Sequence, residues 1–311
     1  MRRSALGLAV LSLGLGLVLA IGGCGGSDDD APPADVATTP DRPPIRIGTK
    51  NFTEQKILGE LYRQALEAKG YEVQLESNIG SSEIVHRVLR RGVLDMYPEY
   101  IGVLLSEVAE ETDRPPSDAA AYNAAQAFER RNGFTLLGQS PLDDRNALAV
   151  TPQFARRHGL ATIADLRKLK RTVKIAAQAE FATRFEGVDG LREVYRLRRI
   201  DVVKAAGSER YAKLDGGDVD VASVFTTEGQ LAGDDYVVLK DPELLFASGR
   251  VAPVASNKLL EEQGPGLRTA IDAVSRALTT SAMREMNGDV DLKKRQPGAV
   301  AGEFLRAQGL L

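Results

Sequence analysis

Apolar and polar positions follow two different periods from Ile45 onward. Ile45 and Ile47 flank Arg46, an alternation typical of a strand, and after a polar turn the apolar residues recur at helical spacing until Gly70. A second short strand, a Gly-Ser turn and a second apolar helix follow, and the strand Val93 to Tyr97 closes the passage. This strand–helix–strand–helix–strand order predicts an α/β domain with a largely parallel sheet.

A second passage with the same order of elements lies farther along the chain. We expect a strand at Ile200 to Lys204, a turn at Gly207, a helix at Glu209 to Leu214 and a strand at Gly217 to Val221. In both passages an aspartate is followed five positions later by an aromatic residue, namely Asp95 by Tyr100 and Asp220 by Phe225. Two similar α/β lobes suggest a ligand held in the cleft between them, at the carboxyl ends of the strands. The alternative is that glycine followed by aspartate is simply common at the starts of strands in α/β proteins.

Two segments are candidates for the crossings between the lobes. Residues 145–151 contain an apolar strand, and residues 250–254 form a second apolar segment. A double crossing is a natural hinge, because a few residues at the ends of elements can absorb the rotation of closure. We therefore assign residues 45–147 and 251–311 to lobe 1, with helices at 259–278 and 303–311, and residues 148–250 to lobe 2.

The first residues have the pattern of a bacterial targeting segment. Arg2 and Arg3 precede an uncharged apolar run, and small residues then lead to the lone Cys24 in a sequence that resembles the lipobox of bacterial lipoproteins. We expect residues 1–23 to be a signal peptide, Cys24 to carry the lipid, and the Gly-, Asp- and Pro-rich residues 24–44 to be a flexible tether. This predicts anchoring on the outer face of the bacterial cytoplasmic membrane, or a periplasmic location. The alternatives are an uncleaved membrane anchor and an ordinary signal peptide beside a spare cysteine.

Composition disfavours several classes of function. The 311 residues carry 40 Lys and Arg against 43 Asp and Glu, a net charge of −3, without the dense basic stripe expected of a nucleic-acid-binding protein. One cysteine and two histidines make neither a disulfide framework nor a Cys/His zinc site, so we expect no metal and no cofactor. We expect His86 and His158 to be solvated, and neither to lie in the cleft beside a carboxylate. Since no nucleophile elbow, P-loop or dinucleotide fingerprint occurs either, an enzyme is disfavoured.

Polar turns precede four of the predicted helices. Helix N-termini bind anions such as carboxylates through free backbone amides. The alternative is plain N-capping by Asn51, Ser82 and Thr226 without a ligand. Arg184 adds a bidentate carboxylate clamp if it faces inward, and Tyr97 could offer a ring face to a cation. The four turns are Lys50–Glu54, Gly80–Glu83, Glu180–Arg184 and Phe225–Glu228.

Five segments together resemble a known family. They are residues 47–60, 80–86, 95–102, 144–150 and 181–184. These segments are similar to the substrate-binding proteins of osmoprotectant ABC importers, which take glycine betaine, choline and related quaternary amines, and the similarity runs from about Ile45 to the C-terminus. The resemblance implies a two-lobed type 2 periplasmic-binding fold that closes on its ligand and docks on ABC permease subunits. We expect the protein to be a monomer.

In that family a quaternary ammonium group sits in a box of aromatic side chains, and an arginine and polar groups hold the ligand carboxylate. The resemblance implies ligand contacts at Asp95, Tyr97, Arg184 and Phe225, and the polar turns add Asn51, Phe52, Ser81, Ser82 and Thr226. Two departures leave the box incomplete: Phe225 stands where the family has Tyr, and Ser248-Gly249-Arg250 replaces an expected aromatic residue. The alternatives are therefore another betaine-type or amino-acid-like ligand, or a ligand-sensing subunit, and Arg250 would repel a cation if it points inward.

Overall fold

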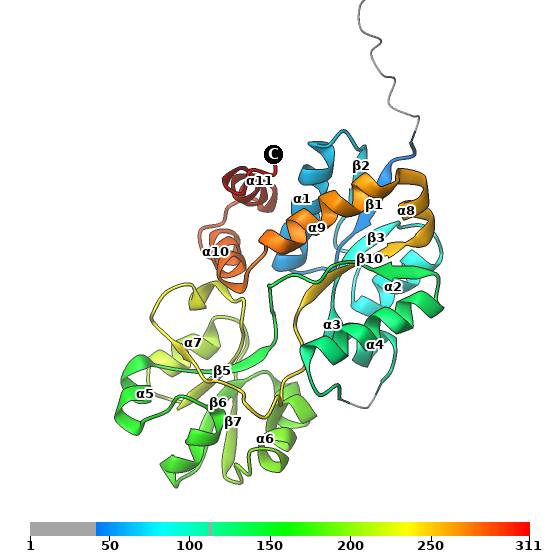
Figure 1. Cartoon of the computed structure of the whole chain (residues 1–311). Helices are drawn as coiled ribbons and strands as arrows, with labels where there is room; N and C mark the ends of the chain where they lie inside the picture. Colours follow the sequence, from blue (N-terminus) through cyan, green and yellow to red (C-terminus); the bar gives the residue numbers. More distant parts are fainter. Residues whose placement is uncertain (1–41, 112–113) are drawn as a thin grey trace, which may run out of the picture. The chain divides into compact units, whose positions relative to one another are not determined.

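The structure is a computed structural model that describes residues 42–111 and 114–311 (Figure 1). The predicted signal peptide, the lipidation site Cys24 and most of the predicted tether lie outside these residues. The described chain forms two five-stranded sheets with helices packed against them, which confirms the predicted α/β class. None of its helices combines the length and the apolar character that a bilayer crossing requires.

The first sheet has the strand order β2-β1-β3-β10-β4. β1 pairs in parallel with β2 and β3, as the helical connections predict, whereas β10 runs antiparallel to both of its neighbours. β10 differs because it enters this sheet from the second one and not through a helix of its own sheet. The strands are β1 (Ile45–Gly48), β2 (Val73–Glu76), β3 (Met96–Tyr100), β4 (Phe134–Leu136) and β10 (Val251–Ser256).

The second sheet repeats this arrangement, with the order β7-β6-β8-β5-β9. β6 pairs in parallel with β7 and β8, and β5 runs antiparallel between β8 and β9. Each position of the first sheet therefore has a counterpart in the second. The strands are β5 (Asn146–Val150), β6 (Val173–Ala177), β7 (Ile200–Lys204), β8 (Val221–Phe225) and β9 (Val237–Val238).

The two aspartates that the sequence marked as counterparts make the same contacts. Asp95 bonds the second residue of β1 twice, accepting from the Arg46 amide at 2.8 Å and donating its own amide to the Arg46 carbonyl at 2.9 Å. Asp220 makes both bonds to Lys174 of β6, each at 3.0 Å. Both aspartates also form ion pairs with arginines, Asp95 with Arg46 and Asp220 with Arg171. The likeness of the two passages therefore extends to individual hydrogen bonds.

Several predicted boundaries move by a few residues. β3 begins at Met96 because the amide of Val93 still bonds to the carbonyl of Val88 (3.3 Å) and so closes the preceding helix. β8 begins at Val221 for the same reason, since the amide of Asp218 bonds to the carbonyl of Lys213. The single helix expected at 259–278 is two helices, because Gly264 adopts a left-handed φ of 76° and Pro265 starts a new helix.

The helices lie in layers on both faces of each sheet. On the first sheet α1, α9, α10 and α11 share one apolar core, and α2 and α4 share the other. Since these layers bury both faces, the ends of the strands are the places left for a ligand. The main helices are α1 (Thr53–Glu67), α2 (Ser82–Arg90), α4 (Asp118–Arg131), α5 (Pro152–His158), α7 (Glu209–Asp215), α8 (Asn257–Gln263), α9 (Pro265–Ala277), α10 (Thr280–Asp291) and α11 (Pro297–Ala307). Shorter turns are α3 (Ile101–Val103), η1 (Leu104–Val108), η2 (Ile163–Leu169), η3 (Ala179–Ala182), η4 (Phe185–Asp189), α6 (Gly190–Glu193) and η5 (Gly229–Leu231).

Helix α10 also joins the segment that follows β8 in the second sheet. Asn287 of α10 donates to the carbonyl of Thr227 at 2.9 Å, and Arg284 donates to the carbonyl of Thr226 at 2.5 Å. The backbones are so close that a Cβ on Gly229 would lie 2.5 Å from the Cα of Gly288. This contact connects the elements of the two sheets in addition to the two chain crossings.

Candidate functional site

A buried lysine stands where β1 ends. The Lys50 ammonium donates to Ser82 Oγ at 2.9 Å and forms an ion pair with Glu99, a residue near the end of β3. The same ammonium lies 4.3 Å from the centre of the Tyr100 ring and 5.8 Å from that of Phe52. The carboxyl ends of β1 and β3 thus already place a cation against two aromatic rings, a favourable geometry for charge on a ring face.

Exposed aromatic rings gather at the carboxyl ends of the parallel strands. Among the Phe and Tyr residues of the described chain only three are exposed, namely Phe52 (40%), Phe185 (39%) and Phe225 (39%). Phe52 follows β1, Phe185 follows β6, and Phe225 is the last residue of β8. Exposed phenyl rings cost free energy in water, so their collection at one kind of position marks a place where a ligand can cover them.

Two carboxyl groups stand beside these rings. Glu54, in the first turn of α1, accepts hydrogen bonds from the Tyr100 hydroxyl at 2.8 Å and from Asn287 Nδ2 at 2.9 Å. Asp144, just before β5, accepts one from the Thr227 hydroxyl at 2.8 Å. Burial raises the pKa of the Glu54 carboxyl, and burial together with the negative charge of Glu54 raises the pKa of Asp144 well above its usual range. Ionisation of these two carboxyl groups is thus disfavoured, and a bound cation would favour it.

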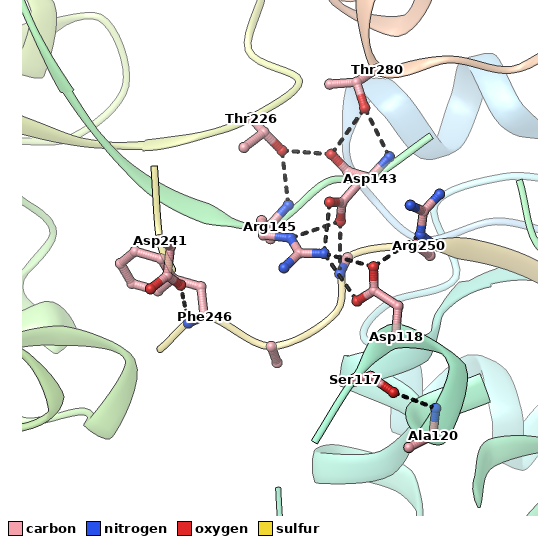
Figure 2. Close-up of polar contacts among 12 residues, drawn as sticks. Ser117, Asp118, Ala120, Asp143, Arg145, Thr226, Asp241, Phe246, Arg250 and Thr280 are labelled. Atoms are coloured by element: carbon pink, nitrogen blue, oxygen red, sulfur yellow. Dashed lines mark hydrogen bonds and ion pairs between the residues drawn. The ribbon is translucent and has the colours of Figure 1, made fainter. Parts of the chain in front are cut away.

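The chain crossings between the sheets are tied by a network of ion pairs (Figure 2). Arg145 pairs with Asp143 at 2.7 Å and with Asp118 at 3.1 Å, and Arg250 pairs with the same Asp118 at 3.1 Å. Thr226 joins the network, because its hydroxyl donates to the Asp143 carbonyl at 2.6 Å and accepts from the Arg145 amide at 3.0 Å. Arg250 and Thr226 therefore hold the two crossing segments together.

The residues predicted at the strand-to-helix turns of the first sheet lie together. Asn51, Phe52 and Ser81 are exposed just before α1 and α2, and Ser82 is buried against Lys50. The alternative of N-capping by Asn51 or Ser82 is wrong, because the N-cap positions of α1 and α2 are Phe52 and Ser81, and neither helix has a side-chain cap hydrogen bond. The first amides of both helices are therefore left without a capping side chain. Arg184, in the second sheet's half, is exposed between η3 and η4.

Two of the predicted site residues lie elsewhere. Asp95 is at the amino end of β3, where Arg46 occupies its carboxylate. Tyr97 is fully buried in the core under α2 and α4, since side chains alternate along β3 and its position faces that core. Tyr100 stands at the end of the same strand and is also buried (4% exposed), with the Lys50 ammonium over its ring. Lys50, Glu54 and Tyr100 belong to segments that the sequence singled out, although none was named there as a ligand contact.

The expectation that His86 is solvated is wrong. It is 3% exposed, and its Nε2 lies 3.1 Å from the Glu129 carboxylate, with Tyr97, Phe128 and Phe134 packed around the ring. The reason is that α4, which carries Glu129, covers α2 on this side of the sheet. The pair lies inside the core of the first sheet. His158 is partly exposed at the end of α5, against Phe154.

Two hollows of the described chain bear on the position of a ligand site. One of about 420 Å³ lies at the carboxyl ends of β6 and β7 and is of a size suited to a small solute. It is lined by Gln178, Ala179, Lys204, Ala205, Ala206 and Glu209. The other, about 780 Å³ between α2 and η1, is lined mainly by charged side chains. Neither hollow is lined by Phe52, Phe185 or Phe225. Within residues 42–111 and 114–311 no three His, Cys, Asp or Glu side chains are grouped so as to hold a metal ion.

Comparison with known proteins decides the family. Residues 43–307 match the family described as the substrate binding domain of the ABC-type glycine betaine transport system. The chain belongs to this family. Its members are substrate-binding proteins of ABC importers, a class of transport proteins and not of enzymes, and the predicted resemblance is confirmed.

Individual relatives agree with this assignment. A glycine-betaine-binding protein of Pseudomonas aeruginosa is 30% identical over 278 residues, covering 86% of this chain and 88% of the relative. The glycine betaine-binding protein YehZ of Escherichia coli is 26% identical, covering 86% and 91%. The crystal structure of a glycine betaine/carnitine/choline ABC transporter protein superposes with a TM-score of 0.79 at 27% identity, covering 86% of this chain and 99% of that one. The predicted two-lobed periplasmic-binding fold is confirmed.

Proposed function

We propose that this member of the family binds a quaternary ammonium solute of the glycine betaine type in a cleft between its two lobes and delivers it to a permease. The observation that carries the proposal is that the three exposed aromatic rings of the described chain all lie at, or on the segment that follows, the carboxyl end of a parallel strand. A ring face binds a desolvated cation with roughly 0.5–2 kcal/mol, so a few rings supply much of the binding energy of a small solute.

The charges at these strand ends suit a zwitterion. Glu54 and Asp144 are neighbouring carboxyl groups with raised pKa values, and a bound ammonium group would favour their ionised forms. Arg184 is exposed and charged, and the uncapped amides at the start of α1 and α2 attract anions, so a carboxylate also has partners. We propose Asn51, Phe52, Ser81, Ser82, Arg184 and Phe225 as ligand contacts, with Tyr100 in place of Tyr97. Thr226 affects binding by holding the crossing segments together, and it does not contact the ligand.

The organisation proposed for the whole chain is that of a lipoprotein receptor. Residues 45–147 with 251–311 form lobe 1, residues 148–250 form lobe 2, and a lipid on Cys24 anchors the protein outside the cytoplasmic membrane as a monomer. Cys24→Ala should release the protein from the membrane fraction without changing ligand affinity. Retention of the variant at wild-type levels would exclude the lipid anchor.

A thermal-shift experiment on the purified full chain tests the ligand class. A ligand that binds the native state raises the midpoint by mass action. Glycine betaine, choline and carnitine are compared with glycine, which has the same carboxylate as glycine betaine but a primary ammonium group. We expect quaternary amines to raise the midpoint and glycine to leave it unchanged. Equal shifts with glycine, or no shift with any quaternary amine, would overturn the proposal.

A further inference from the structure

One of the three exposed rings is already covered by a cation of the chain itself. Arg114 precedes α4 in the first sheet's half, and its guanidinium carbon lies 4.2 Å from the centre of the Phe185 ring in the second sheet's half. Its Nη1 donates to the carbonyl of Leu245 at 2.6 Å, and its Nη2 lies 3.8 Å from Glu186 Oε1. One exposed arginine thus reaches three groups of the second half, and the central contact is a cation on a ring face.

The segment that carries Phe185 is fixed beside Phe225. Glu186 Oε2 accepts a hydrogen bond from Asn146 Nδ2 at 2.8 Å, and Glu186 Oε1 accepts one from the amide of Ala247 at 2.9 Å. Asn146 is the register partner of Phe225 on the neighbouring strand. Phe185 and Phe225 therefore belong to the same end of the second sheet, on two elements that meet at Asn146.

The contact can be exchanged for a ligand. The Arg114 side chain is 40% exposed, so water can solvate the guanidinium when it leaves the ring. A guanidinium and a quaternary ammonium group bind the same negative face of a phenyl ring, so the two cannot occupy it together. A quaternary ammonium group is a good competitor for that face, because its methyl groups donate no hydrogen bonds to water and it loses little on leaving the solvent.

We propose that Phe185 is a cation-binding face of the ligand site and that Arg114 occupies it in the unliganded protein, to be displaced by the ammonium group of the ligand. The inference rests on the proposed function and adds a residue that sets affinity. Arg114 then acts as an internal competitor, and its removal strengthens binding while removal of the ring weakens it.

Titration calorimetry of the full chain with glycine betaine and choline tests the pair. Phe185→Leu keeps apolar bulk but removes the ring face, and we expect affinity to fall about threefold or more. Arg114→Gln removes the competing cation, and we expect affinity to rise about two- to fivefold. In the double variant the gain from Arg114→Gln should vanish, because there is no ring left to uncover.

A matched control distinguishes competition between Arg114 and the ligand from a general effect of the protein's net charge on binding. Arg192→Gln, on α6 in the half that carries Phe185, makes the same charge change at an exposed position and should leave affinity unchanged. If Arg192→Gln strengthens binding as much as Arg114→Gln, the effect is long-range electrostatics and the inference fails. The inference also fails if Phe185→Leu binds as wild type does. Absence of quaternary amine binding by the wild type would instead refute the proposed function.

Fluorescence gives a second, independent measurement. The chain has no tryptophan, so Phe185→Trp creates a single indole at the proposed face. We expect its emission to change when glycine betaine is added, and to change at lower ligand concentration when Arg114→Gln is combined with it. Emission that does not respond to a ligand which calorimetry shows to be bound would overturn the inference.

Discussion

The ion pair between Lys50 and Glu99 should be the most sensitive buried polar contact near the site. Both side chains are inside the protein, at 5% and 0% exposure. Glu99→Gln keeps the size of the side chain and leaves an acceptor for the Tyr100 amide, which now bonds Glu99 at 2.7 Å. The change leaves the Lys50 ammonium buried without a counter-charge, with neutral oxygens, among them the Ser82 hydroxyl, and two ring faces as partners. Breaking one side of a buried pair costs about 3–5 kcal/mol, because the remaining charge is uncompensated.

Urea unfolding followed by far-UV circular dichroism measures this cost. The midpoint should fall while the slope stays constant, which indicates a loss of stability without a change in the surface exposed on unfolding. A double variant, Lys50→Met with Glu99→Leu, removes both charges and should recover a large part of the loss. Glu303→Gln removes a charge from an exposed pair with Arg295 and should leave the midpoint unchanged. A loss below about 1 kcal/mol for Glu99→Gln, or a double variant less stable than the single one, would refute the reasoning.

Three further changes test other parts of the structure. Arg184→Ala should weaken glycine betaine binding about tenfold or more while sparing choline, which has no carboxylate; equal losses in calorimetry would place Arg184 outside the site. The pKa of Asp144 is raised by burial, so the native state holds this proton more tightly than the unfolded chain, and the associated stability is present at low pH and lost as pH rises through the raised pKa. Asp144→Asn should therefore flatten the decline of unfolding free energy with pH in urea titrations, and an unchanged slope would contradict this. Gly229→Ala should lower the melting temperature, because its Cβ would meet the backbone of Gly288, whereas Gly233→Ala, which has nothing closer than 3.9 Å, should not; equal effects would show that the close approach is relieved without cost.

The order of the elements was predictable because it depends on local periodicity. The strands β1 and β2 and the helices α1 and α2 appear where apolar residues alternate or recur at helical spacing. Helix α10 was not predicted, since its residues are mostly polar. Its buried face, which includes Met283, Asn287 and Gly288, is defined by contact with α1 and η5 from distant parts of the chain.

The candidate site shows the same limit at the level of single residues. The strand predicted from the sequence ends at Tyr97, whereas the choice of the strand's end in the structure falls on Tyr100, three positions later. That choice is made by the pairing of β3 with β10, which sets Tyr97 opposite Val254 and Tyr100 opposite Val251. The burial of His86 depends likewise on Glu129, 43 positions away. The burial of such residues depends on contacts between distant parts of the chain, so it cannot be predicted from the local sequence pattern.

The contact of α10 with the segment after β8 has a mechanical consequence. Two bodies joined by two strands can rotate about the line through those strands, but a third attachment off that line blocks the rotation unless it travels with one of the bodies. Arg284 and Asn287 bond main-chain carbonyls after β8, while Asn287 also bonds Glu54 of α1 and Met283 lies in the core of the first sheet. Helix α10 is therefore attached to both sheets, and a rotation of one sheet against the other must break one of these two sets of contacts. The helix thus couples the movements of the two sheets. Because α11 packs against both α1 and α10, a label on α11 paired with one on the second sheet would give a distance that changes when the sheets move.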